Sequence, residues 1–172
     1  MRPEKTSPLV GILMGSKSDL PILQLTIDKL FELGIPCEVK VMSAHRTPEA
    51  ASEYIKQAES RGLKVIIAAA GGAAHLAGFL AGQTILPVIG IPIDATSLGG
   101  LDALLSTVQM PPGVPVATVA IGKFGAVNAA VLAAQIIALG DVKLNNRLKQ
   151  MKKEMAQKVI DACDELNREI GI

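Results

Sequence analysis

Short apolar segments alternate with segments of helical spacing along this chain, and that alternation limits its fold more than any other feature. Strands are predicted at residues 9–14, 36–42, 64–70, 86–91 and 114–121, and helices at 20–33, 47–61, 74–81, 101–108 and 126–139. The strands are apolar at most positions, which is typical of strands covered on both faces. Five such units predict an α/β fold, a three-layer αβα sandwich with a parallel doubly wound sheet of flavodoxin-like or Rossmann-like order.

Residues 142–170 differ from the rest and predict one long amphipathic helix. Its apolar residues recur at threes and fours: Leu144, Leu148, Met151, Met155, Val159, Ala162, Leu166 and Ile170. A helix about 40 Å long at 1.5 Å per residue exceeds the width of a small domain. We therefore expect residues 1–172 to form a single domain whose C-terminal helix packs on a neighbouring subunit, with packing on its own domain as the alternative.

The composition excludes several classes of protein. A mean hydropathy of +0.40 is high for a soluble monomer and indicates burial by other copies or by a membrane. Residues 114–139 are the most apolar, but Lys123 and two glycines divide them into pieces shorter than the ~20 residues that span a bilayer, so no membrane span is expected.

The charge, the N-terminus and the cysteines add three further expectations. A net charge of +1 without a basic block gives no support for nucleic-acid binding. Residues 1–8 are polar and lead into a strand, so no secretory signal is expected. Cys37 and Cys163 are far apart, which favours reduced thiols and a cytoplasmic location.

The loop after the first predicted strand carries Gly15, Ser16, Ser18 and Asp19. Its backbone amides, its hydroxyls and the following helix N-terminus favour an anion. The alternative is that Ser18 or Asp19 only caps the helix. The loop matches neither the P-loop nor the dinucleotide-binding glycine pattern, so neither a triphosphate nor a dinucleotide is indicated.

The loop after the second strand carries Ser43, Ala44, His45 and Arg46, and Thr47 with Pro48 predicts a helix N-cap and first turn. Histidine exchanges protons near neutral pH, and arginine binds carboxylate or phosphate as a fork. This segment therefore predicts a site where a small acidic substrate is held and where protons are transferred.

The loop after the third strand carries Gly71, Gly72, Ala73 and His75. The small residues leave the backbone open to a flat ligand, or else serve close packing of strand on helix. His75 is either a ligand contact or a structural histidine. Because ligands in such sheets bind at the carboxyl ends of the strands, we expect all three loops to share one crevice. Two histidines without clustered carboxylates or thiols predict no metal site.

With these loops in place, the chain resembles a known family, the bacterial-type N5-carboxyaminoimidazole ribonucleotide mutases of purine biosynthesis. The matching segments are residues 14–19 (MGSKSD), 43–48 (SAHRTP), 70–76 (AGGAAHL), 104–111 (LLSTVQMP), 113–122 (GVPVATVAIG) and 128–130 (NAA). The related animal-type carboxylases have a Lys-Gly pair where this chain has Arg46 and Thr47, and they lack the GGAAH loop. The resemblance therefore favours a mutase, with the flavodoxin-like form of the predicted fold.

The resemblance implies a reaction in which a carboxyl group moves from the exocyclic nitrogen of the imidazole ribonucleotide to ring carbon C4, through enclosed CO2. It implies no cofactor (neither metal, ATP nor biotin) and a homo-octamer with its sites shared between subunits. His45 is expected to be the general acid and base, and Arg46 and Ser18 to hold the 5′-phosphate. Other expected substrate contacts are Gly15, Ser16, Asp19, Ser43, Ala44, Gly71, Gly72, Ala73, His75 and Leu76, with residues 106–113 as a lid.

Two other classes stay open at this stage. One is the animal-type CO2-dependent carboxylase, and the other is a flavodoxin-like nucleotide sensor that binds without turnover. A flavoprotein carrier is disfavoured because the chain has one Tyr, three Phe and no Trp on which a flavin ring could stack.

Overall fold

Five parallel strands form the centre of the molecule, in the order β2-β1-β3-β4-β5. The computed structural model describes residues 7–172, so the expectation about a secretory signal lies mostly outside the described residues. The elements are β1 (Val10–Met14), the 3-10 helix η1 (Lys17–Asp19), α1 (Leu20–Glu32), β2 (Cys37–Val41), α2 (Pro48–Ala58), β3 (Val65–Gly71), α3 (Leu76–Ala81), β4 (Val88–Ile93), α4 (Leu101–Val108), β5 (Ala117–Thr118), α5 (Gly122–Ala138) and α6 (Val142–Ile170). This strand order confirms the flavodoxin-like doubly wound sheet.

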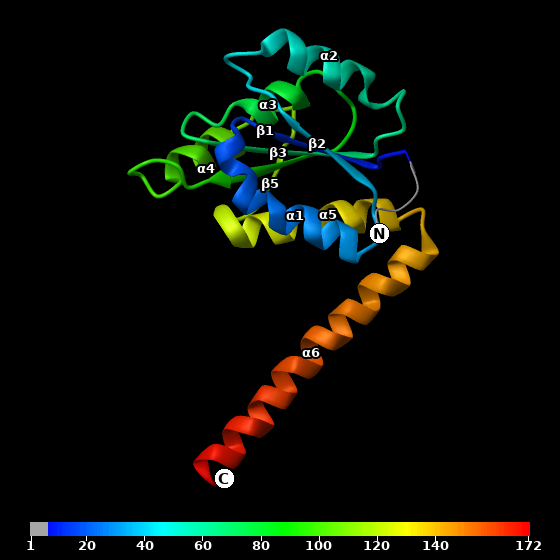
Figure 1. Cartoon of the computed structure of the whole chain (residues 1–172), viewed down its shortest axis with the longest axis vertical. Coiled ribbons are helices and arrows are strands. Elements are labelled where there is room, and N and C mark those ends of the chain that lie inside the picture. Colours follow the sequence, from blue (N-terminus) through cyan, green and yellow to red (C-terminus); the bar gives the residue numbers. More distant parts are fainter. Residues whose placement is uncertain (1–6) are drawn as a thin grey trace.

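The sheet is covered on both faces, as its continuous apolar strands predict. Along β1, Val10, Ile12 and Met14 pack into one core cluster with residues of α1 and α5. Leu13 points to the opposite face and packs with residues of α2 and α3. The helices lie above and below the strands in Figure 1. The predicted three-layer αβα sandwich is therefore confirmed.

Two of the predicted strands differ from what their apolar character suggested. β2 lies at the edge of the sheet and is half-buried or exposed along its length, from the half-buried Cys37 and Glu38 to the exposed Val41. β5 keeps only Ala117 and Thr118 of the predicted residues 114–121. The later start of β5 has a local reason, because Pro115 has no backbone N–H to donate to a sheet.

The helix after β5 begins earlier than predicted, at Gly122 instead of residue 126. The residue type of Gly125 suggested a break at this position, but α5 continues through it. The position of its missing Cβ would overlap the backbone carbonyl of Ala120, so Gly125 permits a close approach between α5 and the preceding segment.

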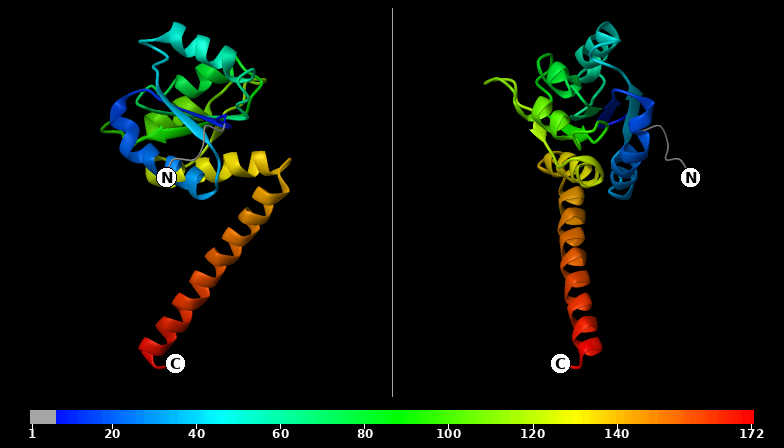
Figure 2. Two further views of the ribbon diagram at one scale, coloured as in Figure 1. Left: turned by 45° about the vertical axis from the view of Figure 1, so that its right-hand side comes forward. Right: turned by 90° about the vertical axis from the view of Figure 1, so that its left-hand side faces the viewer.

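The long helix α6 has the predicted bounds, residues 142–170. Its first turns are attached to the domain, with Leu144 and Leu148 buried against α5 and the Arg147 guanidinium donating to the carbonyl of Leu33 at the end of α1. Beyond Met151 the helix projects away from the sandwich (Figures 1 and 2). Packing on the chain's own domain thus accounts for the first turns only, and packing on a neighbouring subunit stays a prediction for the rest. In residues 7–172, no helix is both long enough and apolar enough to cross a membrane.

Candidate functional site

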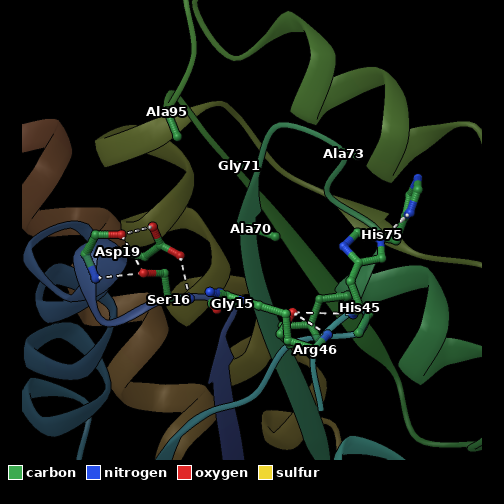
Figure 3. Close-up of a pocket in the computed structure, with 14 residues that line it drawn as sticks. Gly15, Ser16, Asp19, His45, Arg46, Ala70, Gly71, Ala73, His75 and Ala95 are labelled. Carbon is green, nitrogen blue, oxygen red and sulfur yellow. Dashed lines mark hydrogen bonds between the residues drawn. The ribbon is translucent and has the colours of Figure 1, made fainter. Parts of the chain in front are cut away.

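A cavity of about 310 Å³ lies at the carboxyl ends of β1, β2 and β3, where the strand order reverses between β1 and β3. Figure 3 shows residues of the three predicted loops around it. The lining residues are Gly15, Ser16, Ser18, Asp19, Ser43, Ala44, His45, Arg46, Ala70, Gly71, Ala73, His75, Leu76 and Ala95. Of the predicted site residues, the structure brings all except Gly72 to this cavity. Sequence reasoning missed Ala70 and Ala95, whose methyl groups carried no chemical signal.

The first loop is held by hydrogen bonds within a single turn. The Ser16 hydroxyl accepts from the backbone N–H of Ser18, and the Asp19 carboxylate accepts from the backbone N–H of Ser16, both at 3.3 Å. This reciprocal pattern is a capping box, so Ser16 caps the short helix η1. Neither the Ser18 nor the Asp19 side chain caps α1. This differs from the alternative in which one of these residues only caps that helix. The Ser18 hydroxyl donates to Ser16 Oγ at 2.8 Å and stays exposed beside the cavity.

Asp19 is a buried carboxyl beside the cavity, with a side chain only 6% exposed. Burial raises its pKa, while hydrogen bonds from the Ser16 backbone and the Ser18 hydroxyl partly oppose the rise. A buried acceptor of this kind suits neutral hydroxyl groups better than a phosphate, whose charge it would repel. Asp19 therefore fits the predicted ribose end of a nucleotide.

The second loop is a turn shaped by Ser43. Its hydroxyl accepts from the backbone N–H groups of His45 at 3.3 Å and Arg46 at 3.2 Å. Thr47 stands at the N-cap position of α2, and Pro48 occupies the first turn, as predicted. However, the Thr47 side chain does not cap the helix, because it binds the backbone N–H and carbonyl of Ser43 instead. The same residue thus closes the turn that presents His45 and Arg46.

Arg46 joins the first two loops. Its guanidinium donates to the backbone carbonyl of Gly15 at 2.9 Å and stays exposed at the cavity. One donor is used by this contact, so the remaining donors of the fork are available to an anion. Figure 3 shows Arg46 beneath Gly15, on the same side of the cavity as His45.

The two histidines of the chain meet at the cavity. His45 Nε2 lies 2.8 Å from His75 Nδ1, and the rings are edge to face with centroids 4.9 Å apart. One of the two nitrogens must donate and the other accept, so each ring constrains the tautomer of the other. Both histidines are exposed and line the cavity. His75 therefore belongs to the site and is not a structural histidine of the core.

In the third loop, Gly71 both allows close packing and leaves the backbone open to the cavity. A Cβ on Gly71 would lie 2.5 Å from the Cβ of Ala95, so this glycine serves close packing. Gly71 also lines the cavity, with its backbone open to it. Gly72 has φ +63° and turns the chain toward α3 without lining the cavity. The predicted lid, residues 106–113, does not line the cavity either, and its role stays a prediction.

Across residues 7–172, no three His, Cys, Asp or Glu side chains lie close enough to hold a metal ion. The fold and the site together define a flavodoxin-like α/β protein in which two histidines and an arginine line one crevice.

Comparisons with known proteins agree with this class. Residues 9–158 match the family model described as AIR carboxylase. The chain is 56% identical to the N5-carboxyaminoimidazole ribonucleotide mutase of Pseudomonas aeruginosa, over 92% of this chain and 97% of that protein. It is 54% identical to the mutase of Bacillus subtilis, over 92% and 98%. The crystal structure of Treponema denticola PurE superimposes with a TM-score of 0.84 at 34% identity, covering 92% of this chain and 98% of that one. The chain belongs to the AIR carboxylase family.

Proposed function

We propose that this protein is an N5-carboxyaminoimidazole ribonucleotide mutase of purine biosynthesis. The observation that carries the proposal is the placement of His45 and Arg46 on one turn, facing one cavity, with the anion-binding loop 15–19 beside Arg46. The substrate has two ends that such a site would recognise, a 5′-phosphate and an imidazole ring that must exchange a carboxyl group. Relatives more than 50% identical bear this name.

Arg46 and Ser18 hold the phosphate in this proposal. The free donors of the guanidinium form charge-assisted bonds to phosphate oxygens. The Ser18 hydroxyl turns from Ser16 Oγ, to which it donates in this structure, and donates to the phosphate as well. Ser16 orients the phosphate from the capping turn, and the buried Asp19 accepts from ribose hydroxyls. The phosphate end is thus fixed on the first loop and on the arginine that is bonded to it.

His45 transfers the protons of both steps. When the bond between the carboxyl carbon and the exocyclic nitrogen breaks, CO2 departs, and the nitrogen takes a proton from the His45 imidazolium. Ring carbon C4 then attacks CO2 to form the new C–C bond, and its proton passes to the now neutral His45. The catalyst is regenerated and no outside proton is consumed.

The small residues of the second and third loops retain the CO2 between these steps. Ser43, Ala44 and Ala73 line the cavity together with the Gly71 backbone, and His75 with Leu76 closes one side. The amide of Gly72 belongs to the same turn. A dry pocket limits the escape of CO2, and residues 106–113 supply the lid.

The direct test is conversion of N5-carboxyaminoimidazole ribonucleotide by the purified protein, measured with and without added bicarbonate. We expect turnover that does not depend on bicarbonate. Turnover that requires bicarbonate and 5-aminoimidazole ribonucleotide would instead identify a CO2-dependent carboxylase, and binding without turnover a sensor. His45→Asn should still bind the ribonucleotide but lose nearly all turnover, and substantial retained activity would remove His45 from the mechanism.

The proposal extends to assembly and location. We infer a cytoplasmic homo-octamer without nucleic-acid or membrane partners, supported by the exposed apolar residues of α6 and by the net charge of +1. Light scattering should give a mass of about 143 kDa, eight times the chain mass of 17.9 kDa. A monomer mass would contradict the octamer without affecting the proposed reaction.

A further inference from the structure

Thr47 stands at the N-cap of α2, but its side chain does not cap the helix. A threonine at this position ordinarily accepts from a backbone N–H of the first helical turn and so stabilises the helix. Here the start of α2 depends instead on Pro48, whose backbone is preset for the first turn, and on the acidic Glu49 beside it. A side chain that gives up its usual bond beside a functional site indicates that the bond it makes instead has another use.

The Thr47 hydroxyl bonds to both backbone groups of Ser43. It accepts from the N–H of Ser43 at 2.9 Å and donates to the carbonyl of the same residue at 3.2 Å. The backbone N–H of Thr47 donates to that carbonyl as well, at 2.9 Å. On the strand side, the N–H of Met42 bonds to the carbonyl of Met14 at 2.9 Å, so the turn follows directly on the pairing of β2 with β1. Three bonds between Thr47 and Ser43 therefore close the turn, and two of the three need the hydroxyl.

The turn 43–47 carries the two side chains to which the reaction is assigned. His45 Nε2 lies 2.8 Å from His75 Nδ1 of the third loop. The Arg46 guanidinium donates to the carbonyl of Gly15 in the first loop at 2.9 Å. Both His45 and Arg46 are exposed, so little packing around them fixes their direction. The direction in which each side chain points therefore depends on the backbone of the turn.

We propose that the Thr47 hydroxyl is a positioning group for the reaction, because it holds the turn in the conformation that brings His45 and Arg46 to the cavity together. Thr47 does not line the cavity itself, so it acts through these two residues. This role rests on the proposed function, which gives the proton transfers to His45 and the phosphate to Arg46. It adds a residue outside the cavity that sets both turnover and substrate affinity.

Removal of the hydroxyl should loosen the turn without unfolding the helix. Thr47→Val keeps the branched shape of the side chain, but valine can neither accept from nor donate to Ser43. Because Thr47 is exposed and makes no cap, the substitution should change the unfolding temperature by no more than about 2 °C. In the loosened turn only a fraction of the molecules presents His45 and Arg46 together. A displacement of about 1 Å at a site can lower turnover by about 10²-fold, so kcat/KM should fall by about 10–100-fold.

The experiment measures kcat and KM of the purified full chain with N5-carboxyaminoimidazole ribonucleotide. We expect Thr47→Val to lower kcat, because His45 is misplaced, and to raise KM several-fold, because Arg46 is misplaced as well. Thr47→Ser retains the hydroxyl and should restore most of both constants. A merely structural role would reduce the amount of active protein, and hence kcat, and would leave KM unchanged.

Ser52→Ala is the matched control on the same helix. Ser52 donates to the side chain of Gln83, so the substitution removes one hydrogen bond of α2 outside the turn and should leave kcat and KM unchanged. The positioning role is refuted if Thr47→Val resembles the wild type, if it lowers kcat alone, or if Thr47→Ser is equally impaired. A similar loss in Ser52→Ala would also refute it, because any weakening of α2 would then suffice.

Crystal structures of the wild type and of Thr47→Val separate this role from the reaction itself. We expect the turn 43–47 to open in the variant, and the contacts that His45 and Arg46 make with the neighbouring loops to be lost. A turn with both contacts unchanged would contradict the positioning role even if the wild type turns over the ribonucleotide. An opened turn in the variant, together with a wild type that lacks turnover, would support the positioning of the two side chains and contradict only the proposed reaction.

Discussion

Gly71 lies where the third loop touches the segment after β4, and Gly71→Ala should disturb the cavity through that contact. The new Cβ would lie 2.5 Å from the Cβ of Ala95 and 3.2 Å from the carbonyl oxygen of Ile93. Two carbon atoms in good contact are about 3.5–4.0 Å apart, so the segment carrying Ala95 must move by about 1 Å. The φ of Gly71 is not positive, so the effect comes from packing and not from backbone strain.

The size of the effect follows from that displacement. Overpacking of this kind lowers the free energy of unfolding by about 1–3 kcal/mol. Ala95 and Gly71 both line the cavity, and a misplacement of about 1 Å at a site can lower turnover by about 10²-fold. We therefore expect a modest loss of stability together with a large loss of kcat, measured by urea unfolding and by the mutase assay.

Two further variants make the test specific. Gly140→Ala is the matched control, because nothing lies within 4 Å of its missing Cβ, and the free energy of unfolding should stay the same or rise by up to about 1 kcal/mol. Adding Ala95→Gly to Gly71→Ala removes the 2.5 Å contact and should recover most of the activity. If Gly71→Ala behaves like the wild type, or if Ala95→Gly rescues nothing, the packing argument is wrong.

Three other perturbations test separate parts of the site and the fold. Arg46→Ala should weaken ribonucleotide binding by about 10–100-fold, the range of one charge-assisted interaction, and calorimetry showing unchanged affinity would refute the phosphate assignment. Asp19→Asn should weaken ribonucleotide binding, yet at pH 7 it should not lower the free energy of unfolding. The buried carboxyl has a raised pKa, so its ionisation opposes folding as pH rises above its ordinary value of 3.8, and the amide removes that effect. Burial raises the pKa of Glu38, but hydrogen bonds from Arg61 and Tyr54 outweigh it and leave the pKa lowered. The stabilisation by Glu38 is therefore present above its ordinary value of 4.5 and is lost as pH falls through the lowered pKa, so Glu38→Gln should flatten the acid limb of a pH–stability curve.

The convergence of the three loops on one cavity could be predicted because it depends only on topology. Parallel strands send their carboxyl ends to one edge, so a correct strand pattern brings His45, His75 and Asp19 to the same crevice whatever the details of packing. The bounds of α6 were equally predictable, since a periodic stripe is a local property that no distant residue has to complete.

Local hydrogen bonds were harder to predict, because several side chains compete for the same backbone groups. In the first loop, Ser16, Ser18 and Asp19 can all cap a helix, and the structure uses Ser16 for η1. In the second loop, Thr47 stands at the N-cap but binds Ser43, because the turn needs that bond to close. Residue type and spacing are identical in the competing arrangements, so only the three-dimensional path of the chain separates them.

Gly11 shows where sequence reasoning stops. A glycine inside a buried strand signals weakness or a close approach, but not which group approaches. In the structure the Tyr54 hydroxyl occupies the space where a Cβ would stand, and it donates to Glu38 at 2.8 Å. Arg61 pairs with the same carboxylate at 2.8 Å and lies over the Tyr54 ring, 4.7 Å from its centroid.

This cluster ties α2 to β1 and β2. Glu38 and Tyr54 lie 27 and 43 positions after Gly11 in the sequence, so no local pattern links them to it. Burial and the bond to Glu38 raise the pKa of Tyr54, which keeps the hydroxyl a neutral donor in that position. The same helix begins with the turn that presents His45 and Arg46. The chemistry of the site can therefore be predicted from its loops. The contacts that hold those loops in place cannot, because they join residues that are distant in the sequence and meet only in the folded chain.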